Sequence, residues 1–156
     1  MVGTKTALHD DPLLTTRLWP GKDPVRVVID KYLKLPATLN LFNKKNKTIV
    51  LNTIREETDG NNYYHKAAEE DDMILAALNT LYKQQLTSLI VEGGTKLIQS
   101  FIDADCWDEA RVITNKSLLI DNGISAPVLK GEVLSKKEQL LADEICFYKN
   151  IGMSLK

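Results

Sequence analysis

The chain has 156 residues, enough for one domain that buries roughly two thirds of the surface its unfolded form would expose. The chain contains 20 Lys and Arg and 21 Asp and Glu. The resulting net charge of −1 excludes a general basic surface for nucleic acid or an anionic membrane. Cys106 and Cys146 are far apart, and no Cys/His cluster has zinc-ligand spacing, so we expect no metal and two free thiols. No apolar run approaches the length of a membrane span, and we expect a cytoplasmic protein.

Two runs of branched apolar residues predict buried strands. They are "VRVVID" at 25–30 and "TIVLNT" at 48–53, and both are apolar almost throughout, as is typical of strands covered on both faces. The Asn- and Lys-rich connection between them indicates a turn. Residues 55–66 are polar, and we expect a loop there with its tip at 60–62.

A helix is predicted over residues 67–84. An acidic run at 69–72 lies in its first turn or just before it, where carboxylates complement the positive end of the helix dipole. This run therefore indicates a helix start rather than a metal site. The apolar positions that recur at helical spacing are Met73, Ile74, Ala77, Leu78 and Leu81.

The stretch "SLIVEGGTKLIQSFIDA" predicts a buried strand at 88–92, a tight turn at Gly93-Gly94 and a helix at 95–104. The residues leave two interpretations of the turn open. It is a phosphate site at a helix start, or a connector that lets helix and strand pack closely. Glu92 ends the predicted strand, and ligands bind at the carboxyl ends of strands in α/β sheets.

Two further strands are predicted at 108–115 and 144–150, separated by a loop-rich segment at 116–140. The order of strands and helices predicts an α/β fold with a mixed sheet whose later strands are antiparallel.

The opening stretch "GTKTALHDDPLLTTR" reads, from its residues alone, as a turn at Asp10-Asp11-Pro12 followed by a cation at Arg17. The guanidinium of Arg17 could bind a phosphate or a carboxylate, or it could simply be solvated.

Three blocks together resemble the reductase half of the bifunctional deaminase/reductase family of riboflavin biosynthesis. They are "GTKTALHDDPLLTTR", "PVRVVIDK" and "VEGGTKL", and they occur in the family's order and spacing. The resemblance implies a dihydrofolate-reductase-like three-layer sandwich with a mixed central sheet, here without the family's N-terminal strand and helix. It also implies a single, partial reductase domain over 1–156. The implied activity is the NADPH-dependent reduction of the ribosyl group of 5-amino-6-(5-phosphoribosylamino)uracil.

The same resemblance implies roles for individual residues. Arg17 would hold the substrate phosphate, and Asp10 is the acid that we nominate as proton donor. The implied substrate contacts are Leu14, Arg17 and Glu92. The implied cofactor contacts are Thr6, Asp10, Lys31, Gly94, Thr95, Lys96, Leu97, Ile98, Gln99 and Ser100.

Three alternatives stay open at this stage. The chain could be another dihydrofolate-reductase-like NADPH oxidoreductase, or a truncated, non-catalytic module that dimerises. It could also be a fragment of a longer protein, because its first residues correspond, by the resemblance, to the end of a strand. Deamination is not expected, since the zinc-holding motifs of a deaminase are missing. The resemblance implies a homodimer or a larger homo-oligomer.

Overall fold

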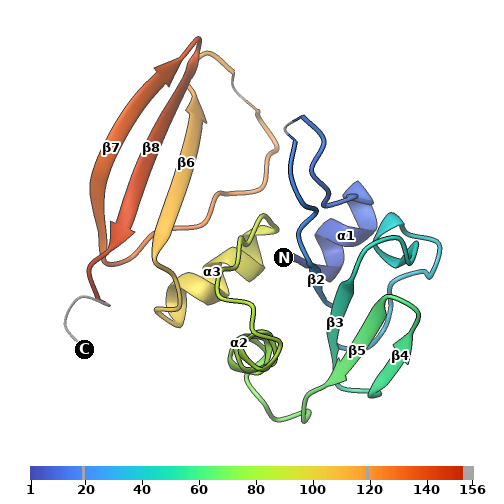
Figure 1. Ribbon diagram of the computed structural model, residues 1–156. Coiled ribbons are helices and arrows are strands. Elements are labelled where there is room, and N and C mark those ends of the chain that lie inside the picture. Colours follow the sequence, from blue (N-terminus) through green and yellow to red (C-terminus); the bar gives the residue numbers. More distant parts are fainter. Residues whose placement is uncertain (19, 119, 153–156) are drawn as a thin grey trace. The chain divides into compact units, whose positions relative to one another are not determined.

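Parallel strands joined by helices come first along the chain, and an antiparallel sheet follows (Figure 1). The computed structural model describes residues 1–18, 20–118 and 120–152, so residue 119, within the predicted loop at 116–140, lies outside the description. The residues group into two units, Met1–Leu97 and Ile98–Lys156. The first unit contains β1 (Val2–Gly3), α1 (Thr4–Asp10), β2 (Arg26–Ile29), the 3-10 helix η1 (Asn40–Phe42), β3 (Thr48–Asn52), β4 (Glu57–Asp59), β5 (Asn62–Lys66) and α2 (Met73–Lys83). Helix α3 (Thr95–Asp103) starts in the first unit and continues into the second, which contains β6 (Glu109–Asn115), β7 (Glu132–Leu140) and β8 (Asp143–Asn150).

The first unit is built on a mixed sheet in the order β1-β2-β3-β5-β4, in which β1, β2, β3 and β5 are parallel and β4 is antiparallel. Strands β2 and β3 confirm the two predicted apolar strands. Both faces of the sheet are covered, since α1 and α2 lie on opposite sides of it (Figure 1). One face packs Val28 and Val50 against Ala7 of α1 and Leu41 of η1. Side chains alternate along a strand, so Ile49 points to the other face, where α2 contacts β3.

Helix α1 is an element that the residues alone did not predict. Its C-cap is Asp11, which adopts a left-handed conformation with φ 40° and donates its N–H to the carbonyl of Ala7. Asp tolerates this conformation better than most residues, so the predicted turn at Asp10-Asp11-Pro12 is the end of a helix.

The predicted loop at 55–66 is wrong, because β4 and β5 form a hairpin there. Its tip does lie where expected, at Gly60, whose φ of 60° suits a residue without a side chain. Strand β5 reads Asn-Tyr-Tyr-His-Lys, so it has no apolar run to reveal it. Its strand conformation follows from pairing with β3, in the register Val50↔Tyr64.

Helix α2 starts later than predicted, at Met73 rather than at 67. Asp72 is its N-cap, and its carboxylate accepts hydrogen bonds from the backbone N–H groups of Ile74 and Leu75. The acidic run therefore marks the helix start, as expected, but it stands before the first turn. None of the helices in the described ranges combines the length and the apolar character that a bilayer crossing requires.

The predicted buried strand at 88–92 is an extended segment paired on one side only. The Glu92 N–H donates to the carbonyl of Met1 at 3.0 Å, and the Gly3 N–H donates to the carbonyl of Gly93 at 3.2 Å. Within the described residues, the only β-bridge next to this segment is an isolated parallel one between Val2 and Gly93. The side chain of Ile90 is 73% exposed. One-sided pairing leaves these side chains partly in solvent, which corrects the prediction.

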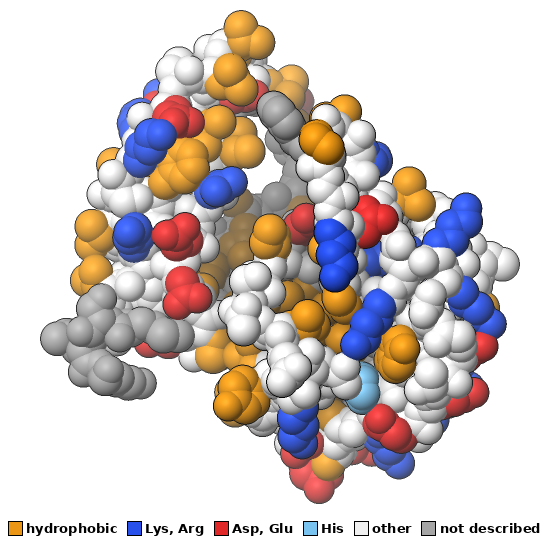
Figure 2. Space-filling model, viewed as in Figure 1, with side chains coloured by type: hydrophobic (Ala, Val, Ile, Leu, Met, Phe, Trp, Pro, Cys, Tyr) orange, Lys and Arg blue, Asp and Glu red, His pale blue; other side chains and the backbone are white. Residues whose placement is uncertain are grey.

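The second unit contains an antiparallel sheet in the order β6-β8-β7. Strands β6 and β8 confirm the predicted strands at 108–115 and 144–150. Strand β7 was not predicted within the loop-rich segment at 116–140, because its exposed, mostly polar residues hide its strand character. Apolar side chains also remain on the surface of this sheet, as the face shown in Figure 2 illustrates, with Ile113, Val133 and Leu134 among the exposed residues.

One ion-pair cluster in this sheet makes it sensitive to acid. Lys116 and Lys137 each place their Nζ 2.7 Å from Oε2 of Glu144, and their hydrogen bonds lower the pKa of Glu144 from 4.5 to about 2. A carboxyl whose pKa falls on folding contributes stability above its unfolded pKa and loses that contribution as the pH falls through its folded pKa. We expect the loss between pH 4.5 and about 2. NMR titration of the Glu144 carboxyl should show the low midpoint, and Glu144→Gln should flatten the acid limb of stability against pH. A midpoint near 4.5 would contradict the prediction.

Candidate functional site

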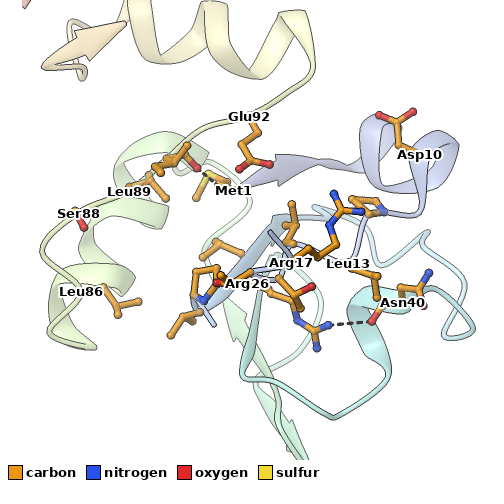
Figure 3. A pocket seen from close by; sticks show the side chains of 18 of the residues that line it. Met1, Asp10, Leu13, Arg17, Arg26, Asn40, Leu86, Ser88, Leu89 and Glu92 are labelled. Carbon is orange, nitrogen blue, oxygen red and sulfur yellow. Dashed lines mark hydrogen bonds between the residues drawn. The ribbon is translucent and has the colours of Figure 1, made fainter. Parts of the chain in front are cut away.

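A cavity of about 740 Å³ lies within the first unit (Figure 3). In this view Leu86, Ser88, Leu89, Met1 and Glu92 lie on one side, and Asp10, Leu13 and Asn40 on the other, with Arg17 and Arg26 between them. Most of its lining comes from three stretches that are distant in sequence, namely the end of α1 with the loop after it, the residues at the start of β2, and the segment 86–92, and Met1, Asn40 and Leu81 complete it.

Four residues predicted to bind substrate or cofactor line this cavity: Asp10, Leu14, Arg17 and Glu92. Leu14 adopts φ 48° and also packs against the apolar core, and this packing holds its backbone in place at the cavity. Pairing of segment 90–93 with β1 brings Glu92 to the same cavity as the loop after α1. Since Pro24, Val25, Arg26 and Val27 also line it, the tertiary structure brings residues of all three sequence blocks to one cavity.

The charges at the cavity suit an anionic, hydroxyl-rich ligand. Arg17 is exposed, and its guanidinium forms no hydrogen bond or ion pair with any described residue. The exposed carboxylates of Asp10 and Glu92 stand on opposite sides (Figure 3). Burial lowers the pKa of the Met1 amino group, and the negative charge of Glu92 opposes that shift. A guanidinium that is not already paired can fork onto a phosphate, and carboxylates can accept from hydroxyl or amino groups.

A second arginine at the cavity, Arg26, was missed as a site residue, although the block "PVRVVIDK" contains it. Only 1% of it is exposed, and burial lowers the pKa of its guanidinium while nearby Asp23 opposes the shift. Each of its three nitrogens donates within the protein: Nε to Thr48 Oγ1 at 2.9 Å, Nη1 to the Asn40 carbonyl at 3.0 Å, and Nη2 to Asn43 Oδ1 at 3.2 Å and the Asn46 carbonyl at 2.9 Å. Arg26 is therefore structural. A charged residue inside an otherwise apolar strand was the signal that could have found it.

Asp30, at the end of the same block, also has a structural role. It is 2% exposed, and its carboxylate accepts from the backbone N–H groups of Lys34 and Leu35 at 3.1 and 2.9 Å. These bonds hold the turn that follows β2.

Two predicted cofactor residues meet at the Gly93-Gly94 turn, whose peptide bond is cis. A Cβ built on Gly94 would lie 2.9 Å from Oγ1 of Thr6, and one on Gly93 would lie 3.4 Å from its Cγ2. The side chain of Thr6 on α1 therefore covers the turn, and only residues without a side chain permit this approach.

Gly94→Ala should destabilise the chain by about 1–3 kcal/mol, because the new methyl group would overlap the Thr6 hydroxyl. Urea denaturation measures the loss. The matched test is a double-mutant cycle in which Thr6→Ala removes the obstructing atoms and should recover most of the lost stability. Equal losses with Thr6 and with Ala at position 6 would show that the clash is not the cause.

The remaining predicted cofactor residues lie away from the cavity lining. The ammonium of Lys31, just after β2, donates to the Glu69 carbonyl at 3.1 Å. Leu97 packs 3.8 Å from the position of a Cβ on Gly3. Gln99 bonds to Asp103 and to the backbone of Val128, and thereby anchors a segment of the second unit. Most of the predicted run lies at the start of helix α3, and Gly94 directly precedes the helix. The residues on the helix are Thr95, Lys96, Leu97, Ile98, Gln99 and Ser100.

Comparison with known proteins now identifies the family. The model of the RibD C-terminal domain matches residues 1–120. The chain belongs to the RibD C-terminal domain family. This confirms the resemblance seen in the three sequence blocks.

Curated relatives of this family member are named as reductases of riboflavin biosynthesis. The 2,5-diamino-6-ribosylamino-4(3H)-pyrimidinone 5′-phosphate reductase of Archaeoglobus fulgidus is 33% identical over 88% of this chain and 69% of its own length. The corresponding reductase of Aquifex aeolicus is 31% identical over 90% of this chain, which spans 66% of it. Riboflavin biosynthesis protein RibD of the same organism is 29% identical, and the chain spans 45% of its length.

Solved structures show the same fold. A deaminase/5-amino-6-(5-phosphoribosylamino)uracil reductase of Thermotoga maritima matches with a TM-score of 0.81 and 24% identity, over 96% of this chain and 44% of that chain. The riboflavin biosynthesis reductase of Saccharomyces cerevisiae matches with a TM-score of 0.76 and 19% identity, over 95% and 73%. The predicted dihydrofolate-reductase-like α/β fold with parallel and antiparallel strands is confirmed.

Proposed function

We propose that the chain reduces the ribosyl group of a phosphorylated ribosylaminopyrimidine with NADPH, as a step of riboflavin biosynthesis. The observation that supports this most directly is the common cavity of Asp10, Leu14, Arg17 and Glu92. All four residues belong to the sequence blocks that carry the family resemblance. Membership of the family and the names of its relatives point to the same reaction class.

The residues of the cavity divide the work of binding and proton transfer. Arg17 holds the substrate phosphate through paired N–H donors, and Leu14 contacts the substrate beside it. Glu92 accepts from ribose hydroxyl groups on the opposite side. Asp10 gives a proton to the ring-opened sugar carbon's oxygen or nitrogen as that carbon is reduced.

The cofactor belongs at the turn between segment 88–92 and α3. When bound, NADPH supplies the hydride, so the protein needs only to bind and orient the two reactants. The turn fits a phosphate-bearing group because the positive end of the α3 dipole points at it and the Thr6 hydroxyl lies beside its glycines. Thr6 and the start of α3 hold the cofactor there, while Lys31 meets the additional phosphate that distinguishes NADPH from NADH.

The substrate pyrimidine has two candidates. The Thermotoga maritima protein is named for the uracil, and the Aquifex aeolicus and Archaeoglobus fulgidus reductases are named for the diaminopyrimidinone. We propose the uracil as the substrate. The diaminopyrimidinone is the second candidate, because the two curated relatives are named for it.

The test offers both pyrimidines in parallel to the purified chain. With NADPH present, its absorbance should fall when the preferred phosphorylated pyrimidine is added, and fall more slowly with NADH. Failure to oxidise NADPH with either pyrimidine would overturn the proposal. Faster turnover of the diaminopyrimidinone would leave the reductase assignment and change the substrate. Light scattering of the same sample tests the proposed homo-oligomer.

A further inference from the structure

The Arg26 guanidinium reaches both ends of the loop that carries Leu14 and Arg17 through hydrogen bonds. The loop runs from the end of α1 to residue 17, and residues 11–17 contain no helix or strand. Because the guanidinium of Arg17 forms no hydrogen bond or ion pair with a described residue, its position depends on how the backbone of this loop is held.

The first connection reaches the start of the loop. Arg26 Nη1 donates to the Asn40 carbonyl at 3.0 Å. Asn40 in turn donates its backbone N–H to Asp11 Oδ1 at 2.7 Å and its amide Nδ2 to Asp11 Oδ2 at 2.9 Å. The same amide is 3.2 Å from the Asp11 carbonyl. Asp11 is the C-cap of α1, so these bonds determine where the loop leaves the helix.

The second connection reaches the other end. Arg26 Nη2 donates to the Asn46 carbonyl at 2.9 Å, and Asn46 Nδ2 donates to Asp23 Oδ2 at 3.0 Å. The second oxygen of Asp23 accepts from the backbone N–H of Thr16 at 2.9 Å. Thr16 directly precedes Arg17, so this bond restrains the backbone from which the Arg17 side chain projects.

We propose that Arg26 is a positioning residue for the substrate site, acting through Asn40 and Asp11 at one end of the loop and through Asn46 and Asp23 at the other. Arg26 does not touch substrate in this role, because each of its three nitrogens already donates within the protein. The inference rests on the proposed function in one respect, namely that Arg17 binds the substrate phosphate.

The test weakens the first connection and cuts the second while the buried guanidinium stays in place, since replacing Arg26 would itself lower the stability of the fold. Asn40→Ala removes the side-chain amide bonds to Asp11 and keeps the backbone one, and Asp23→Ala removes both bonds of its carboxylate. Each should raise the KM for the phosphorylated pyrimidine about tenfold and leave kcat and the Kd for NADPH within about twofold. The matched control is Asn61→Ala, which removes a similar bond to the Lys44 carbonyl. Lys44 lies in the same connection between β2 and β3 as Asn40 but away from the loop. It should leave KM unchanged.

A double-mutant cycle separates positioning from a general structural effect. In an Arg17→Ala background, Asn40→Ala and Asp23→Ala should have little further effect on KM, because the group that they position is gone. Effects that stay tenfold in both backgrounds would overturn the proposal.

Hydrogen exchange gives a readout that needs no activity. The backbone amide of Thr16 should exchange at least about tenfold faster in Asp23→Ala than in Asn61→Ala, and that of Asp11, at the other end of the loop, should exchange faster in Asn40→Ala than in Asn61→Ala. If the parent chain does not oxidise NADPH, the proposed function fails, and the exchange rates still decide whether these bonds hold the loop. Unchanged exchange in both variants rejects the positioning role.

Discussion

Replacing Arg17 with alanine should raise the KM for the phosphorylated pyrimidine about a hundredfold. The guanidinium lies at the cavity without a hydrogen-bond or ion-pair partner among the described residues, so its full donor capacity is available to a phosphate. Charge-assisted bonds contribute about 1.5–3 kcal/mol each, and a hundredfold change corresponds to about 2.8 kcal/mol. Arg17→Lys should recover part of the affinity, because it keeps the charge and loses the paired donors.

The decisive comparison uses a substrate without its phosphate. With the dephosphorylated pyrimidine, the parent chain and Arg17→Ala should have similar KM values, since the missing interaction is the same in both. Arg55→Ala serves as the control, because Arg55 is also exposed but pairs with Glu57 and lies over Tyr64, away from the cavity. A phosphate-independent loss in Arg17→Ala would assign this residue to a different part of the ligand.

Replacing Arg26 with methionine should lower the free energy of unfolding by about 3 kcal/mol. Methionine has a similar length, so the loss comes from the acceptors rather than from an empty space. Thr48 Oγ1 and the carbonyls of Asn40 and Asn46 would keep their places and lose their donor. Leaving buried acceptors unsatisfied costs about 1–3 kcal/mol for each group that water cannot reach.

Urea denaturation measures this change, with Arg55→Met as the surface control. Exposed substitutions of that kind usually change stability by at most about 0.5 kcal/mol. Replacing an entire buried polar cluster by apolar residues can be neutral, but here the acceptors remain. An Arg26→Met variant as stable as the control would mean that the segment 40–46 rearranges to reach water.

Local sequence was sufficient where a pattern depends on neighbouring residues. The branched apolar runs of β2 and β3 predicted strands covered on both faces. Consecutive side chains of a strand point to opposite faces, so a continuous apolar run is buried only when both faces are covered. Helical periodicity predicted α2 and α3, although the first turn of α2 was placed too early. The three sequence blocks also identified the family, because their order and spacing are specific.

Pairing between distant segments decided the rest. Residues 62–66 form strand β5 because they pair in parallel with β3. The segment 88–92 remains exposed because it pairs on one side only, with the residues of β1. These outcomes depend on contacts between residues far apart in the chain, which composition and periodicity do not encode.

The candidate site shows the same division. Its residue types were readable in the sequence, because phosphate binding and proton transfer need a guanidinium and carboxylates. Only the tertiary structure brought Arg17 and Glu92 to one cavity, and only it separated Arg17, available to a ligand, from Arg26, enclosed by acceptors from the segment 40–46. Two arginines of identical chemistry thus have different roles because burial and hydrogen-bond partners, rather than residue type, decide which guanidinium remains available.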